Sequence, residues 1–152
     1  MSQYSFRACL IALSLSLSLL CACSKPLPDE KQIRLAMAKI QLAADEKKLA
    51  QLMHYLHDGF TGKKRMSRRD FQALVFYHFQ NYPRVRTYVS NIDIRIEQNV
   101  ALVSCHLLVT ASHKTIPERG RLYRIDSAWQ KNGDKWQVKQ ADWGDVVEEW
   151  VR

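Results

Sequence analysis

The sequence predicts an α+β domain in which two N-terminal helices pack on a four-stranded antiparallel sheet. Apolar residues recur every three to four positions over residues 33–60 and again over 71–82, which is the period of an amphipathic helix. From Val85 onward apolar residues alternate with polar ones instead, which is the period of a strand. A block of helices followed by a block of strands is typical of the α+β class, with the helices covering one face of the sheet.

The first predicted helix is long. Asp29 and Gln32 have the spacing of a capping box, so the helix is expected to begin there. It is expected to end near His57, before the first glycine that follows. The apolar stripe changes phase over residues 45–48, where the sequence runs Asp-Glu-Lys-Lys, and a bend is expected at that point.

The second predicted helix follows a basic loop. Residues 59–65 contain two glycines and then three consecutive cations, a composition that favours a loop. Ser67 and Asp70 then form a second capping box, which predicts a helix start. Pro83 cannot continue a helix and therefore ends it.

The strands are predicted from alternation and from one turn signal. The Asn132-Gly133 pair favours a two-residue hairpin turn between the last two strands. Short connections of this kind join neighbours in an antiparallel meander. The four predicted strands cover residues 88–96, 100–110, 121–131 and 136–143.

An export signal precedes the domain. Arg7 is the only charge in the first 24 residues, and the apolar run Ala8–Leu20 that follows it has 13 residues. A positive start, a short apolar run and a small residue before the cut predict a secretory signal peptide over residues 1–22. Leu20-Cys21-Ala22-Cys23 resembles a bacterial lipobox, in which Cys23 carries the lipid, palmitate included, as the new N-terminus. The alternative is an ordinary signal peptide cut near Ala22, with Cys23 an incidental thiol.

The predicted mature chain has three parts: a tether over residues 23–28, a domain over 29–143 and an amphipathic tail over 144–152. The tether contains two prolines, so it is short and stiff and holds the domain near a membrane. In Gram-negative lipoproteins an Asp after the lipidated cysteine resembles the mark for inner-membrane retention. Ser24 therefore favours an anchor in the outer membrane, with the domain facing the periplasm.

Charge and cysteine content restrict the partners. The formal charge of +8 becomes +7 when Arg7 leaves with the signal. A basic surface in an envelope favours anionic lipid, lipopolysaccharide phosphates or wall carboxylates, and nucleic acid is not expected there. Cys105 is the one cysteine left after export and lipidation, so no intramolecular disulfide is expected. It lies among Val and Leu in a predicted strand, where a buried, inert thiol is expected.

The order of elements and the tryptophans at the strand ends carry a family resemblance. Two helices, the second opened by Ser-Arg-Arg-Asp, precede long strands that carry Trp129, Trp136 and Trp143. Over residues 29–143 this order resembles a nuclear transport factor 2-like domain. The resemblance implies a cone-like fold, in which a curved sheet wraps around the helices and leaves a pocket between them. Envelope lipoproteins of this kind are generally uncharacterised, and the fold by itself assigns no activity.

The resemblance also implies where catalytic residues would lie. Pocket enzymes of this superfamily place an Asp or His, often with a Tyr, on the apolar concave face. Alternation puts no acid and no histidine on that side of the first three strands. Asp142 shares its parity with Trp136 and Val138, so it is the one candidate for a general base, although pairing with the backbone or an arginine is the plainer interpretation. The residues expected to line a pocket are Tyr55, Tyr123, Trp129, Trp136 and Asp142.

Other side chains support binding more than catalysis. His54, His57 and His78 do not have metal-ligand spacing, so no metal or cofactor is predicted. A basic cluster of five cations is either an anionic contact or a solvated loop: Lys63, Lys64, Arg65, Arg68 and Arg69. In the tail, Trp150 either anchors a partner or packs on its own sheet.

The predicted function is a membrane-anchored, non-catalytic binding or assembly module of the envelope, in which the cone holds a small apolar ligand. Two alternatives remain open. One is a small isomerase, cyclase or dehydratase that uses Asp142 as base, and the other is a structural subunit of an envelope protein complex. A monomer or a sheet-mediated homodimer is expected.

Overall fold

The computed structural model describes residues 27–112 and 119–146. The predicted signal peptide, Cys23, most of the tether and residues 147–152 lie outside this part of the chain. In chain order the elements are α2 (Asp29–Asp45), α3 (Leu49–His54), β1 (Leu56–Gly62), the 3₁₀ turn η2 (Lys63–Arg65), β2 (Met66–Ser67), α4 (Arg68–Asn81), β3 (Arg84–Glu97), β4 (Val100–Ser112), β5 (Arg119–Asn132) and β6 (Lys135–Asp145).

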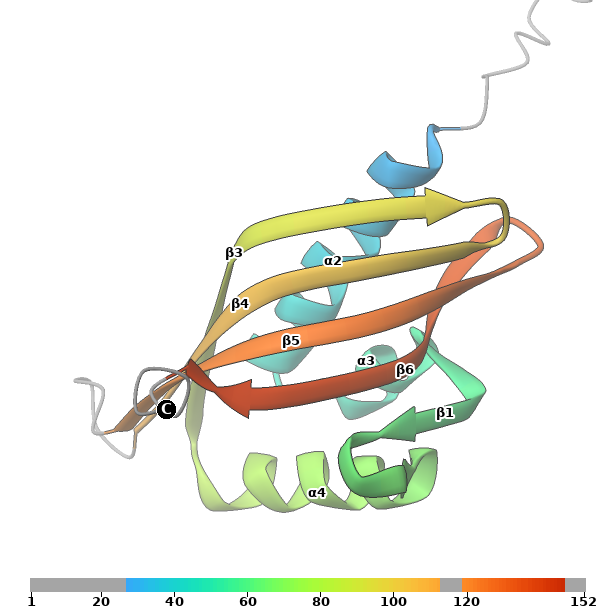
Figure 1. Cartoon of the computed structure of the whole chain (residues 1–152). Coiled ribbons are helices and arrows are strands. Elements are labelled where there is room, and N and C mark those ends of the chain that lie inside the picture. The colour runs from blue at the N-terminus through green and yellow to red at the C-terminus, as the bar shows by residue number, and fades with distance from the viewer. Residues whose placement is uncertain (1–26, 113–118, 147–152) are drawn as a thin grey trace, which may run out of the picture.

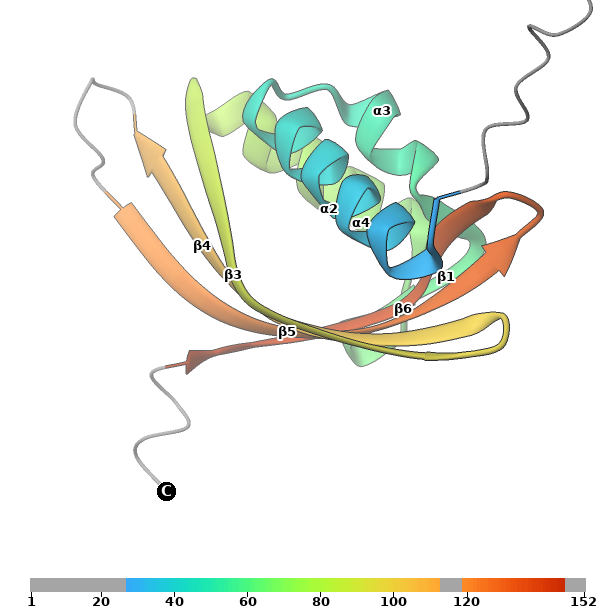
Figure 2. The ribbon, with the colours of Figure 1, turned by 90° about the horizontal axis from the view of Figure 1, so that it is seen from above.

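A curved sheet forms one layer and the helices form the other. The described α-helices α2, α3 and α4 all lie on the concave side of the sheet (Figures 1 and 2). We call the side that faces the helices the inner face and the opposite side the outer face. The strand order is β2-β1-β6-β5-β4-β3, and β1 runs parallel to β6. The α+β class is therefore confirmed, whereas the prediction of two helices and a four-stranded antiparallel sheet is wrong: within the described residues the sheet is six-stranded and mixed.

The predicted long helix is two helices. It breaks at residues 46–48, where the stripe changes phase and Lys47 adopts a positive φ of 57°. The expected capping box at its start is absent, because Pro28 is the N-cap and no side chain caps it. The carboxylate of Asp29 instead accepts hydrogen bonds from Lys131 Nζ (2.6 Å) and Trp136 Nε1 (3.0 Å). These bonds join the start of α2 to the β5–β6 hairpin.

The predicted basic loop contains a strand. β1 takes up the end of the predicted helix, residues 56–57, and the start of the predicted loop. Its seven residues include two glycines and three polar residues, yet they pair with β6 and β2. The glycines allow close approach at this edge. A Cβ added to Gly62 would lie 3.2 Å from the ring of Trp143, and one added to Gly59 would lie 2.9 Å from Lys139 Nζ. Tertiary pairing has therefore overridden a local sequence that disfavours strand.

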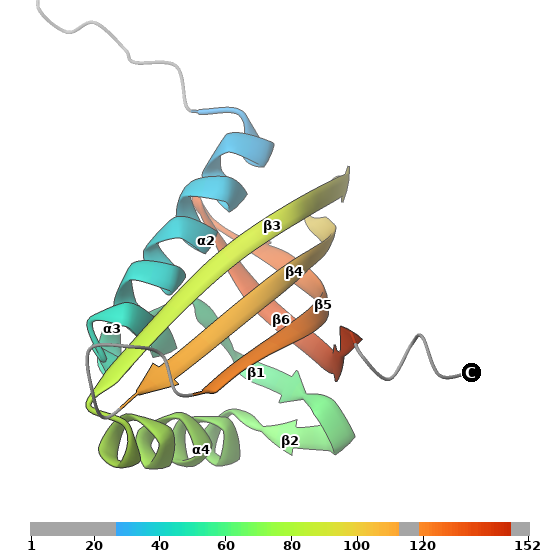
Figure 3. The same cartoon turned by 90° about the vertical axis from the view of Figure 1, so that its left-hand side faces the viewer.

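The second helix agrees with its prediction. Ser67 Oγ accepts a hydrogen bond from the Asp70 amide, and the Asp70 carboxylate accepts one from the Ser67 amide, both at 3.2 Å. This reciprocal capping box satisfies two backbone donors that a helix start leaves unpaired. The helix ends at Asn81, two residues before Pro83. It packs against β1, β2 and α3, and α2 packs against β3 and β6 (Figure 3).

Two bulges decide which side chains face the helices. Ala128 pairs with Gln140 and Trp129 with Val138, so Lys139 is an extra residue in β6. A similar extra residue lies in β3 between Ser90 and Asp93. An extra residue reverses the alternation of inner and outer positions beyond it. Sequence alternation alone therefore assigns the faces of β6 wrongly after Lys139.

The Asp29 contact predicts a pH-dependent contribution to stability. Its hydrogen bonds, first from Lys131 and then from Trp136, hold the pKa of the Asp29 carboxyl below its ordinary value. A depressed folded pKa means that the contribution is present above the unfolded pKa, about 4, and is lost as pH falls through the folded pKa. We expect Asp29→Asn to lower the urea midpoint at pH 7 and to have a smaller effect at pH 3. An equal effect at both pH values would contradict this.

Candidate functional site

The structure does not bring the five predicted pocket residues together. Trp129 and Trp136 are each 3% exposed and belong to the core between α2 and the sheet. Trp129 Nε1 donates to Ser127 Oγ at 3.0 Å, which satisfies its one polar atom. Tyr55 packs at the edge of the same core, and its carbonyl accepts a hydrogen bond from the Val138 amide. These three residues hold the fold together and line no exposed surface of the inner face.

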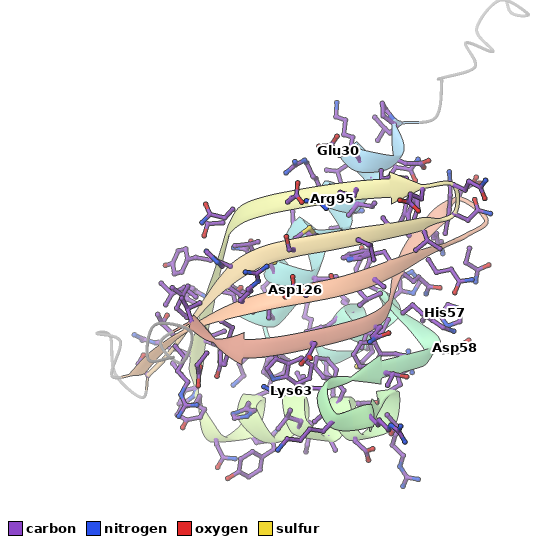
Figure 4. The ribbon with its side chains drawn as sticks, in the orientation of Figure 1. Glu30, His57, Asp58, Lys63, Arg95 and Asp126 are labelled. Carbon is purple, nitrogen blue, oxygen red and sulfur yellow. The ribbon has the colours of Figure 1, made fainter. Side chains whose placement is uncertain are left out.

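Asp142 lies on the outer face, so its predicted inward position is wrong. The bulge at Lys139 reverses the alternation, and Asp142 is exposed and pairs in register with Asp126. Figure 4 shows Asp126 on the side of the sheet away from the helices. One Asp142 oxygen accepts a hydrogen bond from the Trp143 amide at 2.8 Å. Asp142 therefore cannot act as a base toward a ligand between sheet and helices.

Tyr123 is the one predicted pocket residue on an accessible part of the inner face. It lies in a register row with Val89 of β3, Leu107 of β4 and Asp145 of β6. All four side chains are half-buried, and the three apolar or aromatic ones are outside the core cluster. We call this row the open end of the inner face. It carries apolar surface with one phenol and one carboxylate.

Asp145 is the candidate residue that the sequence did not reveal. After the bulge, Ala141, Trp143 and Asp145 occupy inner positions, and Trp143 contacts Phe71 of α4. Asp145 lies opposite Tyr123 and forms a 3.7 Å ion pair with Arg121. The sequence placed it in the tail, because the predicted strand stopped at residue 143. The bulge at Lys139 places Asp145 on the inner face, and the position of this bulge cannot be read from the alternation of residues.

A polar contact closes the neighbouring edge of the sheet. The carboxylate of Asp45 accepts hydrogen bonds from the amide and the hydroxyl of Thr87, each at 2.7 Å, and Gln41 Nε2 donates to the Thr87 carbonyl at 2.7 Å. Thr87 lies in β3, the edge strand, whose backbone groups on that side have no strand partner. Two side chains of α2 thus satisfy an exposed edge that would otherwise invite pairing with another chain.

Cys105 lies deeper on the same inner face and is an inert thiol. Burial, and secondly the charge of Asp126, raise the pKa of the Cys105 thiol from 9.0 to about 11. We expect a disulfide reagent at pH 8 to label the folded protein slowly and the urea-unfolded protein quickly. Because unfolding lowers this pKa, stability should also fall as pH rises from about 9 to 11. Equal labelling rates with and without urea would refute the buried thiol.

The predicted basic cluster divides into two groups. Lys63 Nζ donates to the Trp143 carbonyl, and Arg68 Nη2 donates to the Met53 carbonyl at 2.9 Å, so these two cations hold β6 and α3 in place. The other three, Lys64, Arg65 and Arg69, are exposed. Lys64 and Arg65 both have positive φ, at 56° and 62°. Figures 1 and 3 show the turn between β1 and β2, which carries Lys64 and Arg65, at the opposite end of the molecule from the start of α2.

The described residues contain neither a group of metal ligands nor a helix that could cross a membrane. Within residues 27–112 and 119–146, no three His, Cys, Asp or Glu side chains gather closely enough to hold a metal ion. In the same ranges, no helix has the length and apolar content needed to cross a bilayer.

Comparison with known proteins rests on structure. No protein-family model matches the chain, and no curated protein matches it significantly. A proposed dehydratase from Streptomyces avermitilis, described as a member of the nuclear transport factor 2-like family, superposes with a TM-score of 0.67 at 13% identity, over 78% of this chain and 97% of that chain. The chain has the nuclear transport factor 2-like fold.

Two further structures superpose on this nuclear transport factor 2-like fold. A proposed scytalone dehydratase from Novosphingobium aromaticivorans gives a TM-score of 0.69 at 14% identity, over 78% of this chain and 84% of that chain. Bd1075 of Bdellovibrio bacteriovorus gives 0.69 at 10% identity over 76% of this chain, which spans 41% of that longer protein. At such identities the likeness concerns the fold alone, and the predicted resemblance is confirmed at that level.

Proposed function

We propose that the domain is a binding module whose open end takes a small, largely apolar molecule with one polar group. The observation that supports this is the row of half-buried Leu107, Tyr123 and Asp145, which leaves apolar surface next to a phenol and an ion-paired carboxylate. Ligand sites generally combine apolar walls with a few convergent polar groups. Tyr123 would orient the polar group, and Val89 and Leu107 would contact the apolar part.

Catalysis is the second candidate, and it now rests on Asp145. On the inner-facing positions of β3 to β6 within the described residues, Asp145 is the one carboxylate and no histidine is present. Two structural neighbours are proposed dehydratases, which is compatible with a base at this position. The ion pair with Arg121 occupies the Asp145 carboxylate and holds it in place, so we place binding first.

Binding can be tested at the open end with a matched pair of variants. We would purify the chain from Ser24 onward and measure 2-naphthol binding by quenching of tryptophan fluorescence. Leu107→Lys places a charge on the inner face, and we expect a Kd at least 10-fold weaker. Leu108→Lys, on the adjacent outer position, should bind like the parent. Equal affinities for both variants would reject the open end as the site.

The catalytic alternative needs a different pair. Asp145→Asn removes the inner carboxylate, and Asp142→Asn removes one from the same strand on the outer face. Native mass spectrometry of the gently purified protein first identifies any co-purified molecule, which then serves as the candidate substrate. If its turnover is lost in Asp145→Asn alone, while its binding is retained, the enzyme reading replaces the binding module. Unchanged turnover in both variants excludes Asp145 as base.

The anchor is part of the proposal. Lipid on Cys23 would hold the domain at the outer membrane, facing the periplasm, and this rests on the lipobox-like residues 20–23. Growth with labelled palmitate tests it: Cys23→Ser should lose the label, and Cys21→Ser should keep it. Label retained in Cys23→Ser would rule out that acceptor.

The position of the exposed cations favours a second anionic surface over the anchoring membrane. A tether ending at residue 28 keeps the start of α2 near the anchor, and the turn that carries Lys64 and Arg65 lies at the other end of the domain (Figure 3). We therefore propose that Lys64, Arg65 and Arg69 contact wall carboxylates. Co-sedimentation with purified peptidoglycan should fall in Lys64→Glu/Arg65→Glu and be unchanged in Lys31→Glu, which alters an exposed cation near the start of α2.

A further inference from the structure

Large apolar side chains are exposed along one side of α2. Leu35 and Leu42 are 45% and 56% exposed, and Leu27, just before the helix, is 44% exposed. Leu35 and Leu42 are about two helical turns apart, so both lie on the same side of the helix. The other side of α2 contains the buried residues Ile33 and Ala43 and packs on β3 and β6 (Figure 2). The exposed leucines therefore point away from the sheet.

Two lysines accompany these leucines. Lys31 lies one turn before Leu35 and Lys39 lies one turn after it, and both lysines are exposed. Within residues 27–112 and 119–146, neither lysine forms an ion pair. The exposed carboxylates of α2 and its C-cap are already paired with other cations: Glu30 with Arg34 at 2.9 Å, and Glu46 with Lys48 at 2.6 Å. This side of the helix is therefore apolar with two available positive charges.

We call the set Leu27, Lys31, Leu35, Lys39 and Leu42 the α2 face. We propose that the α2 face lies on the surface of a bilayer that contains anionic phospholipid. Its leucines would enter the boundary between headgroups and acyl chains, and its lysines would meet the lipid phosphates. Helices that lie in this boundary combine apolar and basic residues in the same way. A lysine close to an anionic bilayer strengthens binding about 5-fold.

The length of the predicted tether supports a bilayer as the occupant, and this step rests on the proposed lipid on Cys23. Six residues, 23–28, precede α2, and at about 3.5 Å per residue they reach about 20 Å at most. The anchor therefore raises the local concentration of lipid beside the α2 face. A single acyl signal gives reversible attachment, so a second contact by apolar and basic residues would make the attachment stable.

The two groups of exposed cations would then have different partners. Lys31 and Lys39 would meet the anchoring bilayer. Lys64 and Arg65 lie in the turn between β1 and β2, at the opposite end of the domain from the start of α2 (Figure 3). They would remain free for the wall carboxylates proposed above. This separation supplies a matched control, because each pair of cations can be reversed without changing the other.

Quenching by lipid tests the orientation. The chain from Ser24 onward contains every described element, and an N-terminal histidine tag holds it on vesicles through a nickel-chelating lipid. In a Cys105→Ala background, a fluorophore is attached to Leu42→Cys on the α2 face or to Leu102→Cys on the outer face of the sheet. The two leucines are 56% and 57% exposed. On vesicles of phosphatidylcholine and phosphatidylglycerol with a spin-labelled lipid, position 42 should lose most of its emission and position 102 should keep it.

Reversal of charge gives a second test without cysteines. Binding of the untagged chain to the same vesicles is measured by co-sedimentation. Lys31→Glu/Lys39→Glu should weaken binding about 10-fold or more, because two attractive charges become repulsive. Lys64→Glu/Arg65→Glu should bind like the parent. Equal losses in both variants would show that the net positive charge, and not the α2 face, attracts the vesicles, and a parent that does not bind would also reject the face.

Each other outcome of the quenching experiment overturns the proposal. Similar quenching at positions 42 and 102 would mean that the domain has no preferred orientation on the bilayer. Quenching at position 102 alone would assign the contact to the outer face of the sheet, and no quenching at either position would mean that the domain stands away from the lipid. Failure of the proposed anchor is distinguishable, because it appears as palmitate label retained in Cys23→Ser and leaves the results with tagged protein unchanged.

Discussion

Deletion of Lys139 is expected to unfold the domain or to destabilise it by at least about 3–5 kcal/mol, the cost of removing one large buried side chain. Without the bulge, one part of β6 must turn over relative to β5. If the part after the deletion turns over, Ala141 and Trp143 move to the outer face and Asp142 moves to the inner face. If the part before it turns over, Trp136 and Val138 leave the core. Typical domains have about 5–15 kcal/mol of stability, so a loss of this size removes a large share of it and should shift the urea midpoint clearly downward. Urea unfolding followed by circular dichroism measures the effect.

Lys139→Ala is the control for the deletion. This substitution keeps the extra residue, and therefore the bulge, and removes only the contact of Lys139 Nζ with His57 Nδ1 at 3.1 Å. We expect it to change the unfolding free energy by about 1 kcal/mol or less, as for one ordinary hydrogen bond. If the deletion and the substitution had similar small effects, the bulge would not set the faces of β6.

Trp129→Ala is expected to lower the unfolding free energy by about 3–5 kcal/mol. The indole is buried at the base of the inner face, between α2 and the sheet, and its N–H is satisfied within the protein. The substitution leaves a cavity. It also removes the indole N–H that donates a hydrogen bond to Ser127 Oγ, while the Ser127 hydroxyl keeps its own hydrogen bond to the Val103 carbonyl. A sequence reading that makes Trp129 a pocket residue predicts instead a weaker ligand affinity with little change in stability.

Tyr123→Ala separates these two readings. Tyr123 is half-buried at the open end and lies outside the core, so its truncation should cost clearly less stability than that of Trp129. It should weaken 2-naphthol binding instead. Both variants are followed by urea unfolding and by the fluorescence titration. A Trp129→Ala protein as stable as the parent would show that the base of the inner face is not the core.

The candidate site was predictable only in part. Tyr123 was identified correctly as an inner-face residue, because no bulge in β5 interrupts its alternation. Trp129 and Trp136 were identified as inward-facing too, but periodicity does not distinguish a wall of a pocket from the centre of a core. That difference depends on where α2 lies across the sheet. The sequence predicts Asp142 on the inner face and leaves Asp145 in the tail. The structure has Asp142 on the outer face and Asp145 on the inner face, because one extra residue reverses a pattern of period two.

The α+β class, the long strands β3 to β6, the capping box of α4 and a two-residue turn between β5 and β6 were all predictable from the sequence, although the turn residues are Gly133 and Asp134 rather than Asn132 and Gly133. These features depend on residues close together in the chain, so periodicity and capping chemistry are enough to predict them. That residues 56–62 form a strand depends on contacts distant in the chain, because the edge of β6 supplies backbone partners that this glycine-containing stretch cannot find locally. Tertiary pairing also places Asp145 rather than Asp142 on the inner face, because the extra residue Lys139 allows Val138 and Trp143 both to occupy inner positions.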